Sequence, residues 1–213
     1  MSARTAAVEI AVFARAPVAG EAKTRLVARL GADGAARLQA WLTRRALARA
    51  RAVPGARLSL HTAGDPAHPY WRECTAEFGV ELHEQLGATL GERMAHAFAV
   101  LAPRGAPMLL IGTDAPGQTP ADLIDAAAAL ARADAALQPA LDGGYVLIGL
   151  ARPQSGLFER IDWGSARVLA QTRERAAALG LTLSELRPCP DLDLPADLDA
   201  ACAAGWVSPQ AWR

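Results

Sequence analysis

Residues 8–26 read VEIAVFARAPVAGEAKTRL, an apolar strand followed by a Pro- and Gly-containing loop with three cations. A run of β-formers such as Val8 to Phe13 is typical of the middle of a parallel sheet, and the next loop then lies at the carboxyl edge, where open α/β sheets bind ligands. Arg15, Lys23 and Arg25 can neutralise phosphates there. The pattern indicates a nucleotide phosphate site. A solvated loop with surface cations is the alternative, because neither GxxxxGK[ST] nor GxGxxG occurs.

The composition is typical of a globular protein that can bury a full core. The chain has 213 residues, of which 52% are hydrophobic, and we expect a single domain over residues 1–213. Lys+Arg and Asp+Glu both number 22, so the net charge is zero and no overall field attracts nucleic acid or an acidic membrane. We therefore expect neither of these as a partner.

The cysteines and the apolar runs bear on the compartment. Cys74, Cys189 and Cys202 are far apart, which argues against a disulfide framework or a zinc site and fits a reducing cytoplasm. Residues 1–9 lack the pattern of a secretory leader, and no run approaches the roughly 18 apolar residues of a membrane span. We expect a cytoplasmic protein.

Short β-rich runs alternate with Ala/Leu/Arg-rich helical stretches, which predicts βαβ units around a largely parallel sheet. The expected strands are Val8 to Phe13, Arg57 to Thr62, Val80 to Glu84, Met108 to Gly112, Ala135 to Ala140, Tyr145 to Leu150 and Thr182 to Arg187.

Helix signals occur between these strands. Leu90, Met94, Phe98 and Leu101 recur at helical spacing and should share one face. Thr89 with Glu92, and Thr119 followed by Pro120, are typical helix starts. The arginines between residues 35 and 52 predict a solvated helix face, with a nucleic-acid patch as the weaker alternative.

A second constellation is MLLIGTDAP at residues 108–116, in which an apolar strand ends at Asp114. This carboxylate should lie on the same sheet edge as the cationic loop. Mg²⁺ is usually held by one or two carboxylates plus phosphate oxygens, so Asp114 is a candidate metal ligand. The alternative is an Asp that stabilises a loop turn.

Three further stretches carry candidate residues. Asp142-Gly143-Gly144-Tyr145 has the chemistry of a hairpin turn, and also of a backbone that a substrate can approach closely. Asp193, before Pro195-Ala196-Asp197, is either a helix N-cap or a second metal ligand. Trp163-Gly164-Ser165 precedes a helix expected over residues 166–179, as an N-cap with a packed indole or as a substrate platform.

Six stretches together resemble a known family over about residues 8–198. The chain resembles the bacterial glycosyltransferase-like proteins (rSAM/selenodomain-associated transferase 1, DUF2064) related to 2-phospho-L-lactate guanylyltransferase. The stretches are FARAPVAGEAKTRL (13–26), LGATLGERMAHAF (86–98), GTDAP (112–116), DGGYVLIGL (142–150), WGSARVLAQT (163–172) and DLDLPADL (191–198).

The resemblance implies a GT-A-like nucleotide-diphospho-sugar transferase fold, a three-layer α/β/α sandwich of Rossmann type with a mostly parallel sheet. It implies nucleotide contacts from Ala14, Arg15, Pro17, Lys23, Arg25, Gly91 and Arg93. It implies acceptor contacts from Gly143, Gly144, Tyr145, Trp163 and Ser165, metal ligation by Asp114 and Asp193, and catalytic roles for Asp114, Lys23 and Asp142.

Two departures from the family pattern stand out. Ala115 occupies a position where the family usually has Cys, and Thr113-Asp114-Ala115 supplies one carboxylate where a full DxD would supply two. We expect a transferase dependent on Mg²⁺ or Mn²⁺ that uses a nucleoside triphosphate or nucleotide sugar and a small acceptor. The alternative is a nucleotide-binding regulatory protein that kept the fold without turnover. The oligomeric state is not indicated.

Overall fold

The computed structural model describes residues 7–213, so the expectation of no leader falls largely on residues outside that range. Over the described residues the centre is a seven-stranded sheet in the order β3-β2-β1-β4-β6-β5-β7. Strand β6 is antiparallel to β4 and β5, and the other four neighbouring pairs are parallel. The strands are β1 (Val8–Arg15), β2 (Ala56–Ala63), β3 (Glu81–Glu84), β4 (Met108–Ile111), β5 (Ala135–Pro139), β6 (Tyr145–Leu150) and β7 (Leu183–Glu185).

The mostly parallel sheet is confirmed, and all seven predicted strands are present with ends that differ by at most two residues. No helix in residues 7–213 is long and apolar enough to cross a membrane. The helices are α1 (Val27–Arg51), α2 (Pro69–Phe78), α3 (Leu90–Leu101), α4 (Pro120–Ala129), α5 (Val168–Ala178) and α6 (Pro195–Ala203).

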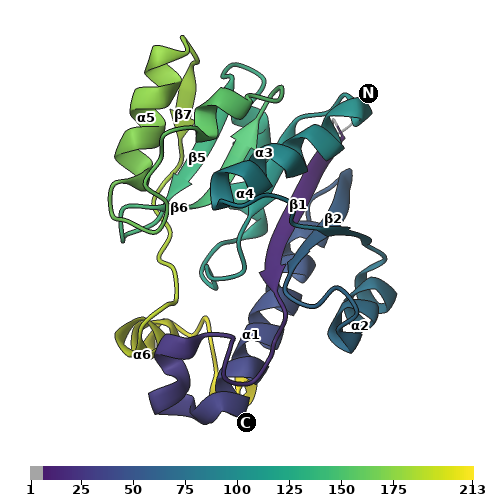
Figure 1. The fold of residues 1–213 in the computed structure, drawn as a ribbon, viewed down its shortest axis with the longest axis vertical. Coiled ribbons are helices and arrows are strands. Elements are labelled where there is room, and N and C mark those ends of the chain that lie inside the picture. Colours follow the sequence, from purple (N-terminus) through teal and green to yellow (C-terminus); the bar gives the residue numbers. More distant parts are fainter. Residues whose placement is uncertain (1–6) are drawn as a thin grey trace.

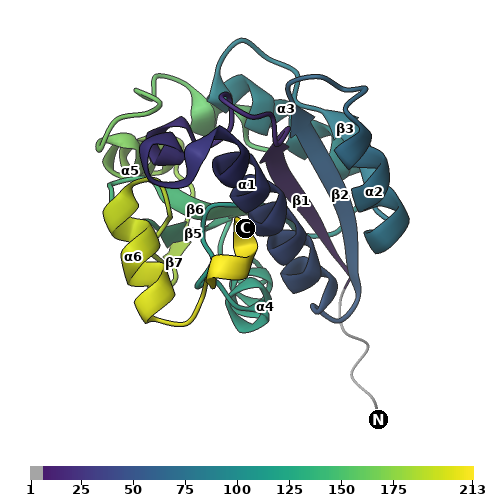
Figure 2. The same cartoon turned by 90° about the horizontal axis from the view of Figure 1, so that it is seen from below.

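Helices cover both faces of the sheet, which confirms the three-layer architecture (Figures 1 and 2). One buried cluster joins β1 and β4 to α1, α2 and α4, through side chains such as Leu47, Trp71 and Leu123. The opposite face packs on α3 and α5, through side chains such as Phe98 and Ala176. Alternate residues of β1 enter the two clusters, as the two-residue period of a strand buried on both faces requires.

A smaller third cluster holds α6 and the C-terminal residues against the part of α1 that ends at Leu42 (Figure 2). Leu38 and Leu42 of α1 meet Leu198 of α6 there, together with Val207. Helix α1 is kinked at Gly31, whose φ of 72° lies in the left-handed region that glycine tolerates. The kink separates the first turn of α1 from the part that packs on the sheet.

Glu9 interrupts the otherwise apolar run of β1. Its side chain is fully buried, and its carboxylate is paired with Arg57 of β2 and with Arg104, whose guanidinium lies 2.9 Å away. A buried carboxylate is tolerated when it is paired and hydrogen-bonded, and the two arginines supply that pairing here.

The predicted helix starts at Thr89 and Thr119 are confirmed. The Thr89 hydroxyl accepts the backbone N–H of Glu92 at 3.2 Å, and the Thr119 hydroxyl accepts that of Asp122 at 3.4 Å. The predicted apolar face of α3 is buried except for Leu90, which is 45% exposed. Leu90 instead lies at the edge of a cavity described below.

The prediction of a fully solvated arginine face on α1 is wrong for Arg49. Its guanidinium is buried and donates to the carbonyl oxygens of Ala115 at 3.0 Å and Gln118 at 3.3 Å. Burial lowers the pKa of Arg49 to about 10. Because Ala115 follows Asp114, this arginine fixes the loop that carries a candidate metal ligand.

Candidate functional site

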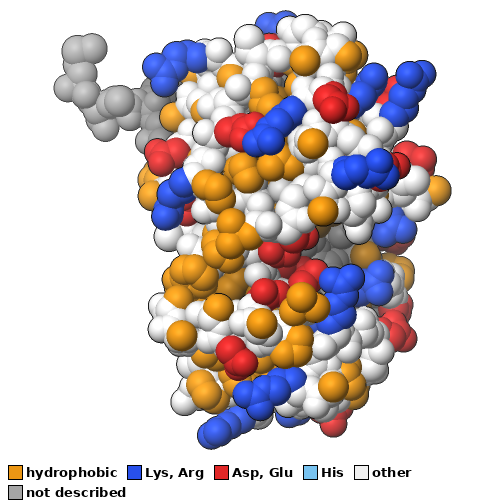
Figure 3. Space-filling model, turned by 90° about the vertical axis from the view of Figure 1, so that its left-hand side faces the viewer, with side chains coloured by type: hydrophobic (Ala, Val, Ile, Leu, Met, Phe, Trp, Pro, Cys, Tyr) orange, Lys and Arg blue, Asp and Glu red, His pale blue; other side chains and the backbone are white. Residues whose placement is uncertain are grey.

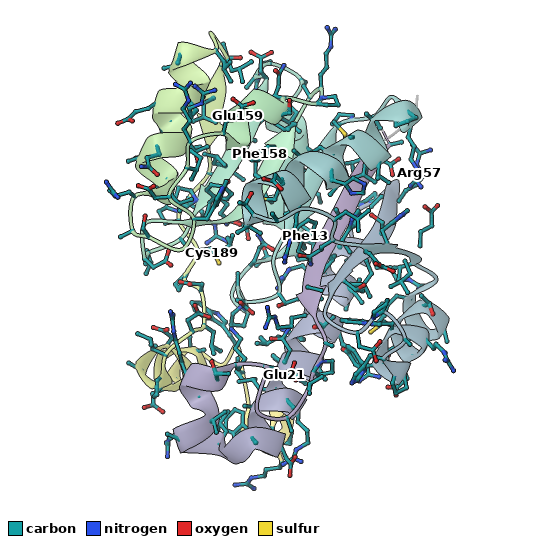
Figure 4. All side chains as sticks on the ribbon, in the orientation of Figure 1. Phe13, Glu21, Arg57, Phe158, Glu159 and Cys189 are labelled. Carbon is teal, nitrogen blue, oxygen red and sulfur yellow. The ribbon has the colours of Figure 1, made fainter. Side chains whose placement is uncertain are left out.

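The site lies where the sheet changes its winding direction. The chain leaves β1 for β2 through α1 on one face, and enters β4 through α3 on the other face, so the loops after β1 and β4 diverge. Such a switch point opens a crevice at the carboxyl ends of the strands. A cavity of about 410 Å³ occupies it, which we call the β1–β4 cavity. Phe13 on β1 and Glu21 on the following loop line it (Figure 4).

The structure brings most of the predicted nucleotide and metal residues to this cavity. Seven of them line it: Ala14, Arg15, Lys23, Arg25, Arg93, Asp114 and Asp193. Pro17 and Gly91 do not line it. Gly91 is buried, and a Cβ there would lie 2.7 Å from the Trp163 indole nitrogen, so it allows α3 to approach the Trp163 segment.

Lys23 is the centre of the polar network in the cavity. Its ammonium lies 2.9 Å from Asp114 and 3.1 Å from Asp193, and it also donates to the backbone carbonyl of Leu192. Burial alone lowers the pKa of Lys23, but the two carboxylates outweigh that and raise it. The two predicted metal ligands thus lie close together, and the Lys23 ammonium bridges their carboxylates.

The two carboxylates keep part of their surface free. The side chains of Asp114 and Asp193 are 43% and 41% exposed, whereas that of Lys23 is 5% exposed. The Arg25 guanidinium lies 3.4 Å from the second Asp193 oxygen. Lys23 itself has a left-handed backbone, with φ of 47°, a conformation that non-glycine residues adopt at an energetic cost.

Asp193 is not the N-cap of α6, so that alternative is wrong. The Asp197 carboxylate accepts the backbone N–H groups of Asp193 at 3.0 Å and Leu194 at 2.7 Å. Asp197 therefore stabilises the helix start, and the Asp193 side chain remains available to the cavity.

A second cavity, of about 300 Å³, adjoins the first and holds most of the predicted acceptor residues. Asp142, Gly144, Tyr145, Trp163 and Ser165 line it. It shares five residues with the β1–β4 cavity, namely Phe13, Arg25, Leu90, Gly112 and Asp193. We call it the hairpin cavity, because it lies beside the turn between β5 and β6.

Tyr145 and Trp163 form an aromatic wall of the hairpin cavity, and their rings pack edge to face with centroids 6.5 Å apart. The Tyr145 hydroxyl is buried and has no hydrogen-bond partner in residues 7–213. Burial raises the pKa of Tyr145 well above its ordinary value. The phenol is therefore neutral and stays a potential hydrogen-bond donor.

Gly143 does not line the hairpin cavity, in contrast to its predicted acceptor role. Its φ is 91°, and a Cβ there would lie 2.1 Å from the carbonyl oxygen of Ala166. Its own carbonyl accepts the N–H of Leu169 at 2.8 Å. Gly143 thus lets the hairpin turn pack under the segment that carries Trp163 and Ser165. The hairpin interpretation of this turn is confirmed.

An acidic hollow lies beside the two cavities, where Asp142, Asp191, Asp193 and Asp197 line one depression. Red acidic side chains gather in the hollowed middle of the molecule in Figure 3. Burial, and next the charge of Asp142, raise the pKa of Asp191 to about 6, with a smaller contribution from Asp193. The negative charges of this hollow repel one another, and Arg25, which also lines it, offsets part of that repulsion at Asp193.

The residues fit a divalent ion that arrives with phosphates. Within residues 7–213, no three His, Cys, Asp or Glu side chains converge to hold a metal by themselves. One oxygen of Asp114 has no protein partner among these residues, and the carboxylate is partly exposed to the cavity. Mg²⁺ and its analogues are commonly bound by one or two carboxylates, with phosphate and water completing the shell.

Several residues that line the β1–β4 cavity are not singled out by the sequence patterns. They are Glu21, Gln39, Gln85 and Thr113. Glu21 and Thr113 lie inside quoted motifs, which is the signal that could have identified them. Gln39 lies in a helical run whose pattern predicts only packing.

The sheet, its switch point and its layers define the class of Rossmann-like nucleotide-diphospho-sugar transferase folds. The chain belongs to the family described as "Uncharacterized protein conserved in bacteria (DUF2064)", whose model matches residues 46–165. No curated protein matches the chain.

One solved structure is similar in both sequence and fold. It is a candidate nucleotide-diphospho-sugar transferase from Desulfovibrio desulfuricans G20, at 32% identity and a TM-score of 0.83. The match covers 91% of this chain and 85% of that one.

Two further structures share the fold at lower identity. CMP:2-keto-3-deoxy-manno-octonic acid synthetase complexed with CTP matches at 12% identity and a TM-score of 0.59, over 93% of this chain and 98% of that one. Rv0371c of Mycobacterium tuberculosis H37Rv, in complex with manganese, matches at 19% identity and a TM-score of 0.52, over 92% and 97%.

Proposed function

We propose that this protein is a transferase that binds a nucleoside triphosphate or nucleotide sugar with a divalent ion in the β1–β4 cavity. It transfers the nucleotidyl or glycosyl group to a small acceptor in the hairpin cavity. The observation that carries the proposal is that a cation-lined cavity with two carboxylates adjoins a second cavity and shares five lining residues with it. The 32%-identical relative supports the donor class.

In this proposal the donor phosphates contact Arg15, Arg25 and Arg93 at the rim. Arg15 and Arg25 are exposed, so they can turn toward a ligand without breaking a buried contact. Arginine suits such a role, because its planar fork pairs with two phosphate oxygens at once. Arg93 is already oriented, since its Nε donates to the carbonyl of Gly87 at 2.9 Å.

Asp114 would hold the divalent ion, with Asp193 as the second carboxylate. When bound, the ion would neutralise charge on the phosphates and on the leaving group. Lys23 now neutralises both carboxylates. In the loaded site we expect its ammonium to turn to a donor phosphate, so that it also stabilises the departing oxygen.

On the acceptor side, Asp142 is the group that can orient an attacking hydroxyl. One of its oxygens accepts the N–H of Gly144 at 2.8 Å, which holds the carboxylate at the cavity wall. Its other oxygen remains for the acceptor. Trp163 and Tyr145 supply an apolar wall that excludes water around the reacting atoms.

Two chemistries use this arrangement. In nucleotidyl transfer the acceptor oxygen attacks the α-phosphorus of a nucleoside triphosphate and pyrophosphate leaves. In glycosyl transfer it attacks the anomeric carbon of a nucleotide sugar and the nucleoside diphosphate leaves. In both, the charge that develops on the leaving phosphates meets the same cations.

Phosphorus NMR of the leaving group tests the proposal. The protein is incubated with Mn²⁺, a donor panel (ATP, GTP, CTP, UTP and UDP- and GDP-sugars) and small phospho-acids, sugars and alcohols. Metal-dependent release of pyrophosphate or of nucleoside diphosphate, with Asp114→Asn inactive, is the expected result. Nucleotide binding without either product over the whole panel would contradict transfer and favour the non-catalytic alternative.

A further inference from the structure

A chain of hydrogen bonds runs from the core of α1 to the candidate metal ligand. The amide nitrogen of Gln39 donates to the Thr113 hydroxyl at 3.2 Å, and that hydroxyl donates to Oδ1 of Asp114 at 3.0 Å. Gln39 and Thr113 are each only 5% exposed. Two buried polar side chains thus lead to one oxygen of a partly exposed carboxylate.

The direction of every bond in this chain is fixed. The Thr43 hydroxyl gives its proton to the backbone carbonyl of Gln39 at 2.9 Å, and the Thr113 hydroxyl gives its proton to Asp114. Each hydroxyl has one proton, so both oxygens can only accept from the Gln39 side chain. The amide nitrogen must therefore face them, and the opposite amide orientation is excluded.

The chain determines which Asp114 oxygen is free. Oδ1 is held from two sides, by Thr113 at 3.0 Å and by the Lys23 ammonium at 2.9 Å. Oδ2 has no protein partner in the described part of the chain. A carboxylate anchored through one oxygen presents the other in a fixed direction, which reduces the orientational freedom that ligand binding would otherwise remove.

We propose that Gln39 and Thr113 are positioning residues that orient the Asp114 carboxylate for the divalent ion. The inference rests on the proposed function and goes beyond it, because it gives Gln39 and Thr113, which both line the β1–β4 cavity, a role that acts through Asp114. Outer partners of this kind are worth between about tenfold and a hundredfold in metal affinity where they have been removed.

The test separates metal contact from nucleotide contact. Calorimetry gives the Kd of ATP, GTP, CTP and UTP with Mn²⁺ and again with EDTA. The Kd in EDTA divided by the Kd with Mn²⁺, which we call the Mn²⁺ ratio, reports the contribution of the ion. Thr113→Val, which keeps the shape and removes the hydroxyl, should lower that ratio at least about tenfold. Because Thr113 also lines the β1–β4 cavity, a direct effect on the nucleotide would appear in the EDTA Kd and cancel in the ratio. Thr113→Ser should restore most of the ratio.

Thr43→Val is the matched control. It removes the other acceptor of the Gln39 amide and leaves the hydrogen bonds from Gln39 through Thr113 to Asp114 intact. The variant can lower the stability of the protein, but the Mn²⁺ ratio should equal that of wild type. Gln39→Met should lower the ratio in the wild-type background and have no further effect in Thr113→Val, since both act through one hydroxyl.

The outcomes separate this inference from the function on which it rests. If wild type binds no nucleotide under either condition, the proposed function is wrong and the positioning role falls with it. If wild type shows a clear Mn²⁺ ratio that Thr113→Val leaves intact, or if Gln39→Met and Thr113→Val act additively, the function stands and the positioning role is wrong.

Discussion

Lys23 is the residue on which the charge balance of the site depends. Its ammonium is almost fully buried between Asp114 and Asp193, each of which is about two-fifths exposed. The Lys23 ammonium neutralises the same two carboxylates that a divalent ion would neutralise. A metal and Lys23 should therefore compete for these oxygens unless a phosphate attracts the lysine away.

Replacing Lys23 by methionine should change metal and nucleotide binding in opposite directions. Without the ammonium, the two carboxylates lose their internal counter-ion, so the affinity for Mn²⁺ alone should rise. Nucleotide affinity in EDTA should fall about tenfold, because a charge-assisted phosphate contact is lost. Electron paramagnetic resonance of free Mn²⁺, together with calorimetry of the nucleotide, measures both.

Arg25 is the natural comparison for that experiment, since it is exposed and its ion pair is with Asp193 rather than with both acids. Arg25→Met should weaken nucleotide binding and leave the affinity for Mn²⁺ alone nearly unchanged. If Lys23→Met binds Mn²⁺ no better than wild type does, the prediction that the ammonium and the ion compete for these carboxylates is wrong.

The raised pKa of Asp191 gives a pH-dependent prediction. Its pKa moves from an ordinary 3.8 to about 6 in the folded protein, so the folded state binds the proton more tightly than the unfolded state. The associated stability is present below about pH 4 and is lost as pH rises through about 6. Above that pH the Asp191 carboxylate is charged, which burial disfavours most, and Asp142 and the other acidic neighbours repel the charge.

Asp191→Asn should therefore raise the melting temperature at pH 8 and leave it almost unchanged at pH 4. Two pKa units correspond to about 3 kcal/mol in an unscreened site, and we expect about 1 kcal/mol because the side chain is partly exposed. Thermal unfolding followed by circular dichroism at the two pH values measures the difference. An equal shift at both would rule out the charge of Asp191 as the cause.

Among the elements, the β5–β6 hairpin decides the shape of the acceptor side. Gly143, in its turn, lies against the backbone of Ala166, and its φ of 91° is strained for any residue with a Cβ. Gly144 has no such neighbour, since a Cβ there would approach only the Asp142 carboxylate, at 3.2 Å. Steric intolerance at this turn therefore belongs to Gly143 rather than to Gly144.

Gly143→Ala should displace the segment that carries Trp163 and Ser165 and so impair turnover with the acceptor. Nucleotide binding in the β1–β4 cavity should survive, because that cavity does not include the turn. We expect a loss of about 1–3 kcal/mol in stability from strain at the positive φ and the backbone clash. Urea unfolding and calorimetry of nucleotide binding check the two parts.

Gly144→Ala is the matched control for that substitution. It adds the same methyl group to the same turn, and it should cost less stability. Equal losses for the two variants, or loss of nucleotide binding in Gly143→Ala, would contradict a packing role confined to the hairpin side.

The sequence predicts the elements better than it predicts their contacts. Strand composition and the caps at Thr89 and Thr119 are local signals, and the structure confirms them. Arg49 and Gln39 are different, because their partners come from a loop more than sixty residues away. Nothing in a helical pattern distinguishes an arginine that faces water from one that binds buried carbonyls.

In the candidate site, too, the sequence predicts what local motifs determine and misses what depends on tertiary contacts. Motifs place Lys23 and Asp114 at one edge of the sheet, because the carboxyl ends of β1 and β4 lie side by side. That the lysine also bridges to Asp193 depends on the path of the chain from β7 to α6, which no local pattern determines. The sequence predicts an acceptor contact for Gly143, whereas the structure places this glycine against Ala166 and outside the lining of the hairpin cavity, a tertiary neighbour that is not visible in the sequence.

For the whole molecule, charge is organised locally within a neutral chain. The net charge is zero, yet cations gather at the rim of the β1–β4 cavity, and carboxylates gather in the hollow beside it (Figure 3). A neutral protein gains little from long-range steering, so recognition of an anionic donor must come from contacts inside the cavity.

Thermal unfolding with nucleotide and metal tests the central claim most directly, because a ligand that binds only the folded state stabilises the whole molecule. At about a hundred times its Kd, a ligand contributes about 2.7 kcal/mol, which corresponds to a rise in melting temperature of roughly 5–10 °C for a chain of this size. We predict such a rise with at least one nucleoside triphosphate or nucleotide sugar and Mg²⁺, reduced by Asp114→Asn. An unmoved melting curve over the full panel, or an equal rise in Asp114→Asn, would contradict the account.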